Sequence, residues 1–214
     1  MITQTQTKMA YQSGVASAEG AHAWLRRSAE IIEATCVHLP EERIDGAIVA
    51  ISEGLSCNKP LLICGNGGSA SDAMHITGEL VGRFLMERRA LRAVCLADNP
   101  SVLTAWSNDY SFEDVFARQV EAYGEPGGVL LGISTSGKSP NVLAALATAR
   151  RMGLVTVGLT GEGGGRMAPL CDHLLDVPSR STPLIQQVHI CLYHHICAGI
   201  EERLAAEGAS SEPA

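Results

Sequence analysis

His75 and Glu79 lie four residues apart in the stretch "DAMHITGELV", whose other residues are mostly apolar or small. If this stretch is helical, both side chains project from one face. A His and a Glu on one face can form a surface ion pair, move a proton between adjacent carbons as an acid/base pair, or bind a divalent metal. The sequence lacks an HExxH pattern, which disfavours a zinc protease.

The last helix expected in the chain carries further candidates. "TPLIQQVHICLYHHICAGIEERL" places glutamines and histidines among strongly apolar residues. Polar groups are costly to bury without partners, so some of them must face a site, an interface or water. Gln187 and His194 share a face, whereas Gln186 lies about 80° away from it on an ideal helix. Periodicity alone therefore does not choose between the two glutamines.

Two small polar segments follow apolar runs, "GNGGSAS" at 65–71 and "STSGKSPN" at 134–141. Glycine lets the backbone approach a ligand, helix N-termini present free N–H groups to anions, and hydroxyls add donors. Either segment alone could be a tight turn with a capping serine. The two together predict a cradle for the phosphate of a small metabolite, because neither fits a P-loop or a dinucleotide fingerprint.

The elements that must position these groups follow from the apolar pattern after residue 60. Five short apolar runs, typical of strands buried on both faces of a parallel sheet, alternate with helix-like segments. The runs are "PLLIC", "LRAVCLA", "GVLLGIS", "LVTVGLT" and "HLLDV". This alternation predicts an α/β layered fold with right-handed crossovers. The helices are expected at about 69–86, 111–123, 140–152, near Arg166, and 183–206.

The ends of the chain are expected to differ from this core. Residues 1–60 read as a helical segment that packs on the core or on a neighbouring subunit. Residues 208–214 are small and polar and are expected to be disordered. No linker or internal repeat separates a second domain from the core at 61–207.

Composition excludes several classes of protein. At 214 residues with 46% hydrophobic and 18% charged content, the chain suits one soluble domain. A net charge of −7 without a Lys/Arg run argues against nucleic-acid binding. No apolar run reaches the roughly 20 residues needed to span a bilayer, so no membrane partner is expected. The first residues do not read as a signal peptide.

Cysteine usage indicates a reducing compartment. The seven cysteines include no CxxC pair, which makes a cysteine zinc site improbable. Cys64, Cys95, Cys191 and Cys197 lie in apolar stretches and are expected to be buried, reduced thiols. We therefore expect a cytoplasmic protein.

Five segments together resemble the sugar isomerase (SIS) domain and, within it, the phosphoheptose isomerase family. They are "GNGGSASDAMH", "SNDYSFEDVFARQ", "GGVLLGISTSGKSPN", "LTGEGGGRM" and "STPLIQQVH". The resemblance covers roughly Leu61 to Leu204. It implies an αβα sandwich with a five-stranded parallel sheet, a homotetramer, and the interconversion of sedoheptulose 7-phosphate and an aldoheptose 7-phosphate.

The resemblance also implies a role for each matching residue. Implied phosphate-binding residues are Ser69, Ser134, Thr135, Ser136 and Ser139. Implied sugar-binding residues are Asn66, Gly67, Gly68, Asn108, Asp109 and Gln186. Glu79 matches the catalytic carboxylate and His194 the catalytic imidazole. A divalent-metal site, usually zinc with one ion per subunit, is matched by His75, Glu79, Gln186 and His194.

Three other functions are compatible with the same motifs. The chain could isomerise a different phosphosugar, because the loops read only a phosphate and an α-hydroxycarbonyl. It could be a non-catalytic sugar-phosphate sensor or adaptor of the same fold, since fold alone does not give function. It could also be a metal hydrolase, which would release inorganic phosphate. The presence of both Glu79 and His194 favours an enzyme.

Overall fold

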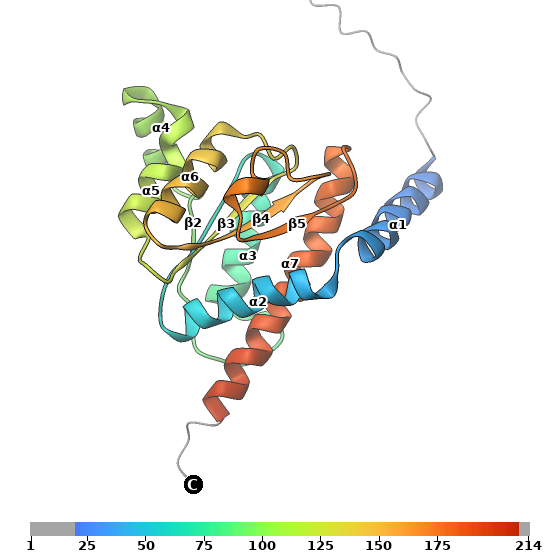
Figure 1. Ribbon diagram of the computed structural model, residues 1–214, viewed down its shortest axis with the longest axis horizontal. Coiled ribbons are helices and arrows are strands. Elements are labelled where there is room, and N and C mark those ends of the chain that lie inside the picture. The colour runs from blue at the N-terminus through green and yellow to red at the C-terminus, as the bar shows by residue number, and fades with distance from the viewer. Residues whose placement is uncertain (1–19, 210–214) are drawn as a thin grey trace, which may run out of the picture.

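The computed structural model describes residues 20–209 and is built on one five-stranded sheet (Figure 1). All neighbouring strands are parallel, in the order β2-β1-β3-β4-β5. The strands are β1 (Leu61–Gly65), β2 (Ala93–Cys95), β3 (Val129–Ser134), β4 (Val155–Thr160) and β5 (His173–Asp176). Each lies in one of the five apolar runs, so the predicted α/β fold with a five-stranded parallel sheet is confirmed.

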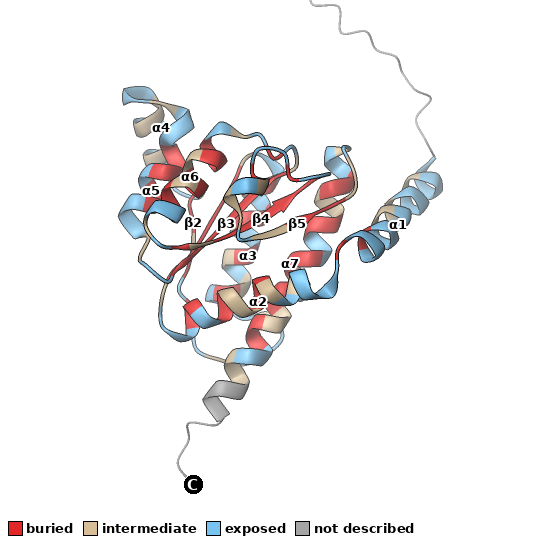
Figure 2. Cartoon of the chain, in the orientation of Figure 1, coloured by how far each residue is buried: buried red, intermediate tan, exposed pale blue. Residues whose placement is uncertain are grey.

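Helices cover both faces of the sheet. They are α1 (Ala21–His38), α2 (Glu41–Ser56), α3 (Gly68–Val81), α4 (Pro100–Asp109), α5 (Val115–Tyr123), α6 (Pro140–Arg151) and α7 (Thr182–Ala209). Two short 3-10 helices, η1 (Phe112–Asp114) and η2 (Ala168–Leu170), complete the elements. One apolar core joins the sheet to α2, α3 and α7, and a second joins its other face to α5 and α6. Buried residues follow these inner faces and the strands (Figure 2).

The N-terminal helices differ in how they meet this body. α2 lies across one face and contributes Ile48, Ile51 and Leu55 to the core. α1 packs against α7 and otherwise projects from the molecule, with Thr35 its one buried residue (Figure 1).

Several helix boundaries correct the sequence-based expectation. α3 ends at Val81 rather than Met86, because the chain turns at Gly82 and the following N–H groups bond outside the helix. The expected helix at 111–123 begins as the 3-10 helix η1. The expected short helix near Arg166 is the 3-10 helix η2. α7 continues to Ala209, so 208 and 209 are helical, and the rest of the expected disordered tail, 210–214, lies outside the described residues.

Helix α4 was not predicted. Its cap is nonetheless visible in the sequence: the side chain of Asn99 accepts hydrogen bonds from the backbone N–H groups of Ser101 (3.1 Å) and Val102 (3.2 Å). Pro100 occupies the first turn, where its missing N–H costs nothing.

Within 20–209, none of the helices combines the length and apolarity that crossing a bilayer requires. The seven cysteines are all free, and Cys64, Cys95 and Cys197 are buried as expected. Cys191 is exposed, which corrects its prediction, because it lies on the side of α7 that turns toward α1.

A buried histidine links α7 to the sheet. His189 is 0% exposed, and its Nε2 lies 3.1 Å from the carbonyl oxygen of Thr160 at the end of β4. Burial lowers the pKa of His189 to about 4, and the hydrogen bond to Thr160 opposes this shift only in part. At neutral pH the ring is therefore uncharged and bonds the sheet as a neutral donor.

This pKa predicts acid sensitivity. In the unfolded chain His189 binds a proton below about pH 6.5, whereas in the folded protein it stays neutral down to about pH 4. Because the unfolded state then binds more protons, the free energy of unfolding falls as the pH drops through this window. The fall from this one group amounts to about 3 kcal/mol. Urea unfolding at pH 7 and pH 4.5 should show a smaller pH-dependent loss for His189→Gln than for the wild type. Exposed His22→Gln is the control and should match the wild type; equal losses in all three proteins would contradict the prediction.

Candidate functional site

The two predicted loops meet at one edge of the sheet. β1 and β3 are neighbours, so the loops after them lie side by side at the carboxyl ends of the strands. α3 begins directly after the first loop and α6 after the second, and neither helix has a side-chain cap. Most N–H groups of these first turns are already paired: those of Ser69, Ala70 and Ser71 donate to loop carbonyl oxygens, and that of Val142 donates to Asn141 Oδ1. Pro140 has no N–H, so the first turns offer an anion the N–H groups of Gly68 and Asn141 together with the positive ends of the helix dipoles.

Hydroxyl groups cluster in the second loop. Ser134 is 4% exposed, and its Oγ lies 2.9 Å from Oγ of Ser139 and 3.4 Å from Oγ of Ser136. Ser139 stands at the N-cap position of α6 but leaves the helix N–H groups uncapped. The loop thus presents three adjacent hydroxyls at the N-terminus of α6, which suits a phosphate group.

A pair of amides ties the two loops together. Asn66 and Asn141 exchange two hydrogen bonds, each 2.9 Å long from Nδ2 to Oδ1. Asn66 was predicted to hold the sugar. Through Asn141, it also links the first loop to the first turn of α6. Sequence reasoning did not select Asn141, although it closes the "STSGKSPN" segment.

The glycine-rich turn at 161–165 braces the hydroxyl-bearing loop. The backbone N–H groups of Arg166 (2.9 Å) and Met167 (3.1 Å) donate to the carbonyl oxygen of Gly137. Gly137 has φ +61°, and a Cβ there would overlap the carbonyl group of Gly164. The close approach of the two turns therefore requires glycine at 137.

Asp176 connects this brace to the N-terminal helices. Its carboxylate is 5% exposed and accepts a hydrogen bond from the N–H of Gly163 at 3.1 Å. His38 Nε2 lies 2.9 Å from Oδ2, and Arg43 lies 3.5 Å from Oδ1. A single buried carboxylate thus joins α1 and α2 to the turn behind the phosphate-type loop.

The start of α7 reaches both loops. Oγ1 of Thr182 lies 3.3 Å from Oγ1 of Thr135. A Cβ at Gly68 would overlap the amide nitrogen of Gln186, so that amide lies directly against the start of α3. Oε1 of Gln187 is buried without a hydrogen-bond partner among the described residues. Gln186 is therefore the glutamine that faces the first loop.

Further along α3 and α7, three predicted residues converge. His75 Nε2 lies 2.9 Å from Glu79 Oε1, and His194 approaches from α7 with its ring centroid 5.1 Å from that of His75. One ligand atom from each of the three residues lies within 4.8 Å of the others. The side chains are part-exposed, at 45% for His75 and 23% for Glu79, so a ligand can reach them.

Tyr193 and Asp72 were not predicted, yet both lie beside this cluster. The Tyr193 hydroxyl lies 2.9 Å from His75 Nδ1. Burial, and next the charge of Asp72, raises the pKa of Tyr193 to about 12. Burial raises the pKa of Asp72 to about 6, while His75 opposes the shift. Tyr193 therefore stays neutral and fixes the His75 ring through its hydrogen bond at Nδ1.

The cluster fits a divalent metal. An imidazole–carboxylate–imidazole set is suited to zinc, and the separation of the donor atoms lets them meet around one ion. A hydrogen bond from Nδ1–H of His75 to Tyr193 would leave Nε2 free as a ligand, the arrangement that metal-binding histidines adopt. The fourth predicted ligand, Gln186, lies about 12 Å before His194 along α7, so its amide must extend toward the cluster to join it.

Sequence and structure comparisons place the chain in a known family. The family model described as "SIS domain" matches residues 23–161. The phosphoheptose isomerase of Crocosphaera subtropica is 50% identical over 164 residues, which is 77% of this chain and 84% of that protein. The chain belongs to the phosphoheptose isomerase family of SIS-domain proteins. It is an enzyme, an isomerase of phosphosugars.

Solved structures of phosphoheptose isomerases share its fold. The enzyme from Neisseria gonorrhoeae superimposes with a TM-score of 0.79 at 39% identity. The enzyme from Francisella tularensis gives 0.81 at 34% identity. Each match covers 85% of this chain and 96% of the other. The family match begins within α1, so the N-terminal helices are part of the similarity.

In this phosphoheptose isomerase, two of the predicted sugar-binding residues lie far from the other predicted site residues. Asn108 and Asp109 are exposed at the end of α4 and bond to each other, with 3.0 Å between Nδ2 and Oδ1. Figure 1 places α4 beyond α5 and α6, at the far end of the molecule from α7. Within one subunit, the structure does not bring them to the cluster of His75, Glu79 and His194.

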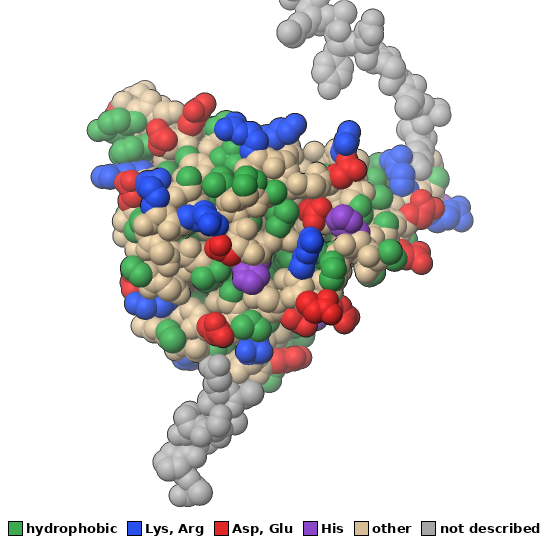
Figure 3. Space-filling view, in the orientation of Figure 1, with side chains coloured by type: hydrophobic (Ala, Val, Ile, Leu, Met, Phe, Trp, Pro, Cys, Tyr) green, Lys and Arg blue, Asp and Glu red, His purple; other side chains and the backbone are tan. Residues whose placement is uncertain are grey.

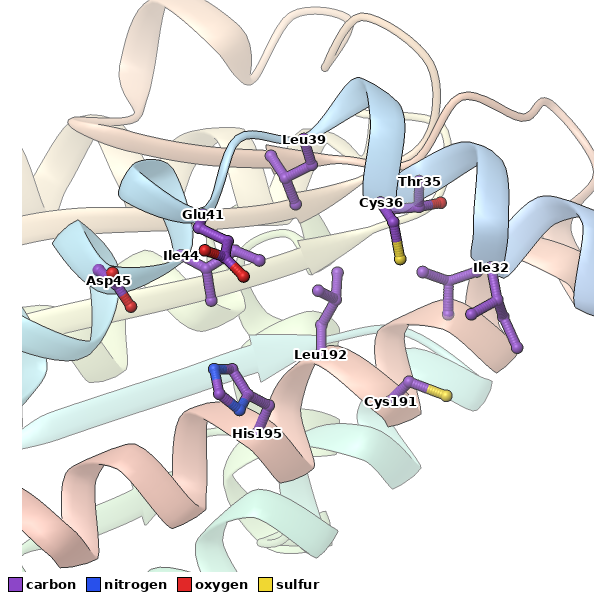
Figure 4. Close-up of a pocket in the computed structure, with 11 residues that line it drawn as sticks. Ile32, Thr35, Cys36, Leu39, Glu41, Ile44, Asp45, Cys191, Leu192 and His195 are labelled. Carbon is purple, nitrogen blue, oxygen red and sulfur yellow. The ribbon is translucent and has the colours of Figure 1, made fainter.

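A separate groove lies between the N-terminal helices and α7. It encloses about 440 Å³ and is walled mainly by apolar side chains of α1, α2 and α7. Cys191, Leu192 and His195 line it from α7: His195 lies on the side of Glu41 and Asp45 of α2, and Cys191 on the side of Ile32 and Cys36 of α1 (Figure 4). None of the predicted site residues lines it.

On the face shown in Figure 3, Lys and Arg side chains are interspersed with Asp and Glu.

Proposed function

We propose that this enzyme interconverts sedoheptulose 7-phosphate and D-glycero-D-manno-heptose 7-phosphate through an enediol. The observation that carries the proposal is the meeting of Glu79 and two imidazoles on the same pair of helices whose first turns border the phosphate-type loops. The phosphate-type loops lie at the N-terminal ends of α3 and α7, and the cluster of His75, Glu79 and His194 lies further along both helices. An extended sugar phosphate suits this arrangement, with its phosphate at the loops and its carbonyl at the cluster.

The two loops at the first end of the site bind the phosphate group. Ser69 and the hydroxyls of the second loop hold the phosphate, together with the N-terminal ends of α3 and α6 and their helix dipoles. Asn66, the backbone of the first glycine turn at 67–68, and Gln186 orient the sugar hydroxyls. This anchoring fixes which carbons reach Glu79, and positioning of this kind contributes much of the rate in enzymes.

Proton transfer takes place at the other end of the site, at Glu79 and His194. Glu79 takes the proton from the carbon next to the ketose carbonyl, and the electron pair of that C–H bond forms the enediol double bond. His194 gives a proton to the carbonyl oxygen and removes one from the neighbouring hydroxyl. The carboxyl proton of Glu79 exchanges with water while the enediol is bound, and Glu79 then gives a proton to C2, so atoms and charge balance without a redox partner.

Zinc is the proposed cofactor, one ion per subunit, held by His75, Glu79, Gln186 and His194. When bound, it would supply Lewis-acid polarisation of the carbonyl and hydroxyl oxygens. The support is the fit of the three converging side chains to that ion.

A substrate panel tests the proposal. Turnover of sedoheptulose 7-phosphate should exceed that of a ketohexose and a ketopentose phosphate by more than about tenfold in kcat/KM, because shorter sugars leave polar groups of the site unpaired. A chelator should lower turnover, and added Zn²⁺ should restore it. Preference for a shorter phosphosugar would reject the heptose, released inorganic phosphate would indicate a hydrolase, and indifference to chelation would reject the zinc.

We also propose that the enzyme is a cytoplasmic homotetramer with sites completed at subunit contacts. Support comes from α1, where Leu25 and Val37 are 63% and 87% exposed, and from the apolar groove beside it. The remote placement of Asn108 and Asp109 is explained if they serve a neighbouring subunit. Native mass spectrometry should give four chains; a monomer that turns over substrate fully would reject the assembly.

A further inference from the structure

The segment after α3 is held by a carboxylate from the far end of α7. Glu201 is 0% exposed and accepts hydrogen bonds from the backbone N–H groups of Phe84 (2.8 Å), Leu85 (2.7 Å) and Met86 (2.9 Å). Burial favours the neutral acid, but these three donors and Arg88 hold the pKa of Glu201 below its usual range. The carboxylate is therefore ionised and serves as the hydrogen-bond partner of three successive backbone N–H groups.

Arg88 extends this contact to the helix that carries Glu79. Its guanidinium lies 3.0 Å from Glu201 Oε1, and its side chain is 4% exposed. The same guanidinium donates to the carbonyl oxygens of Glu79 and Gly82, each at 2.8 Å. It thus satisfies the last carbonyls of α3, where a cation also complements the helix dipole. The final turn of α3 is fixed by a buried ion pair.

Phe84 extends the same contact to the other catalytic helix. Its ring stacks on that of His194, with 5.4 Å between centroids and 18° between planes. His75 and Tyr193 pack edge-on against the His194 ring, at 5.1 and 4.9 Å. Phe84 is therefore the ring stacked on His194, and its backbone N–H donates a hydrogen bond to Glu201.

We propose that Glu201 is a positioning residue for the isomerisation: it fixes Phe84 against His194 and, through Arg88, fixes the last turn of α3 that carries Glu79. The inference rests on the proposed roles of Glu79 and His194. The hydrogen bonds and the ion pair of Glu201 go to residues 84–88 and not to the side chains of Glu79 or His194. It therefore acts on the geometry around these two side chains and leaves the phosphate-type loops unchanged.

The first test is Glu201→Gln, which keeps the shape but turns an amide N–H₂ toward N–H donors. We expect kcat to fall at least about tenfold, with KM and the Kd of inorganic phosphate within about threefold of wild type. Hydrogen–deuterium exchange should quicken in peptides spanning 82–88 and stay unchanged in β1. Wild-type kcat despite faster exchange at 82–88 would overturn the proposal, and so would equal losses in kcat and phosphate binding with faster exchange throughout the sheet.

Phe84 variants decide the matter if Glu201→Gln does not fold. Phe84→Leu removes the stacked ring and should lower kcat about tenfold at nearly constant KM, and Phe84→Tyr should restore it. Tyr123→Leu, an aromatic loss on α5 far from the site, is the matched control and should leave kcat unchanged. Equal kcat for Phe84→Leu and Phe84→Tyr would overturn the proposal. Failure of the proposed function is distinct, because it would appear as turnover by Glu79→Gln while the exchange result at 82–88 stands.

Discussion

Replacing Glu79 with glutamine is expected to abolish turnover while leaving the fold and phosphate binding intact. Glutamine keeps the size of the side chain and can still hydrogen-bond to His75, whose Nε2 lies 2.9 Å from Glu79 Oε1. It cannot take a proton from carbon, so the general-base contribution, typically about 10²–10⁴-fold, is lost. Steady-state kinetics with sedoheptulose 7-phosphate, and titration with inorganic phosphate, measure the two halves of this expectation.

The stability of this variant should change little. The His75–Glu79 pair is part-exposed, and such pairs contribute about 0–1 kcal/mol. Glu121→Gln is a matched control, because Glu121 is an exposed carboxylate on α5 that pairs with Arg118 at 3.2 Å. The control should retain full turnover. Near-normal turnover by Glu79→Gln would contradict the assignment of the base.

Replacing Gly137 with alanine is expected to disable the phosphate end. Gly137 has φ +61°, and the added Cβ would overlap the backbone carbonyl of Gly164, which cannot move without displacing the turn at 161–165. The hydroxyl-bearing loop must therefore shift away from its brace. We expect KM for the phosphosugar and Kd for inorganic phosphate to rise at least about tenfold.

Gly127→Ala is the control that separates steric overlap of the added Cβ from backbone strain. Gly127 also has a positive φ, +80°, but the nearest atom to its added Cβ would be Lys59 Cγ at 3.9 Å. Both variants should lose about 1 kcal/mol of stability from the left-handed conformation. Only Gly137→Ala should lose phosphate affinity, as measured by calorimetric titration. Equal affinity in the two variants would show that the brace does not shape the phosphate site.

Local patterns in the sequence were sufficient to predict the sheet. Each strand is an apolar run buried on both faces, and burial on both faces is what such runs indicate. α4 escaped prediction because it is short and none of its residues is fully buried, so its apolar stripe amounts to little more than the partly buried Leu103 and Trp106. The true end of α3 was also hidden, since the bonds that end it come from Glu201, more than one hundred residues further along the chain.

The site was predictable only in part for a similar reason. Helical spacing places His75 beside Glu79, and glycine and hydroxyl content marks both loops. Periodicity in α7 could not choose Gln186 over Gln187, because that choice depends on how α7 packs against Gly68. Asn141 and Tyr193 were missed because their partners, Asn66 and His75, lie on other elements. Contacts between distant segments leave no local signal.

Solvent-isotope incorporation during turnover tests proton transfer by Glu79 most directly. The enzyme is incubated with sedoheptulose 7-phosphate in D₂O, and the aldose product is examined by NMR. Proton transfer through an enediol predicts deuterium at C2 of the product with the wild type and no product with Glu79→Gln. Product without deuterium at C2, or deuterated product formed at the wild-type rate by Glu79→Gln, would contradict it.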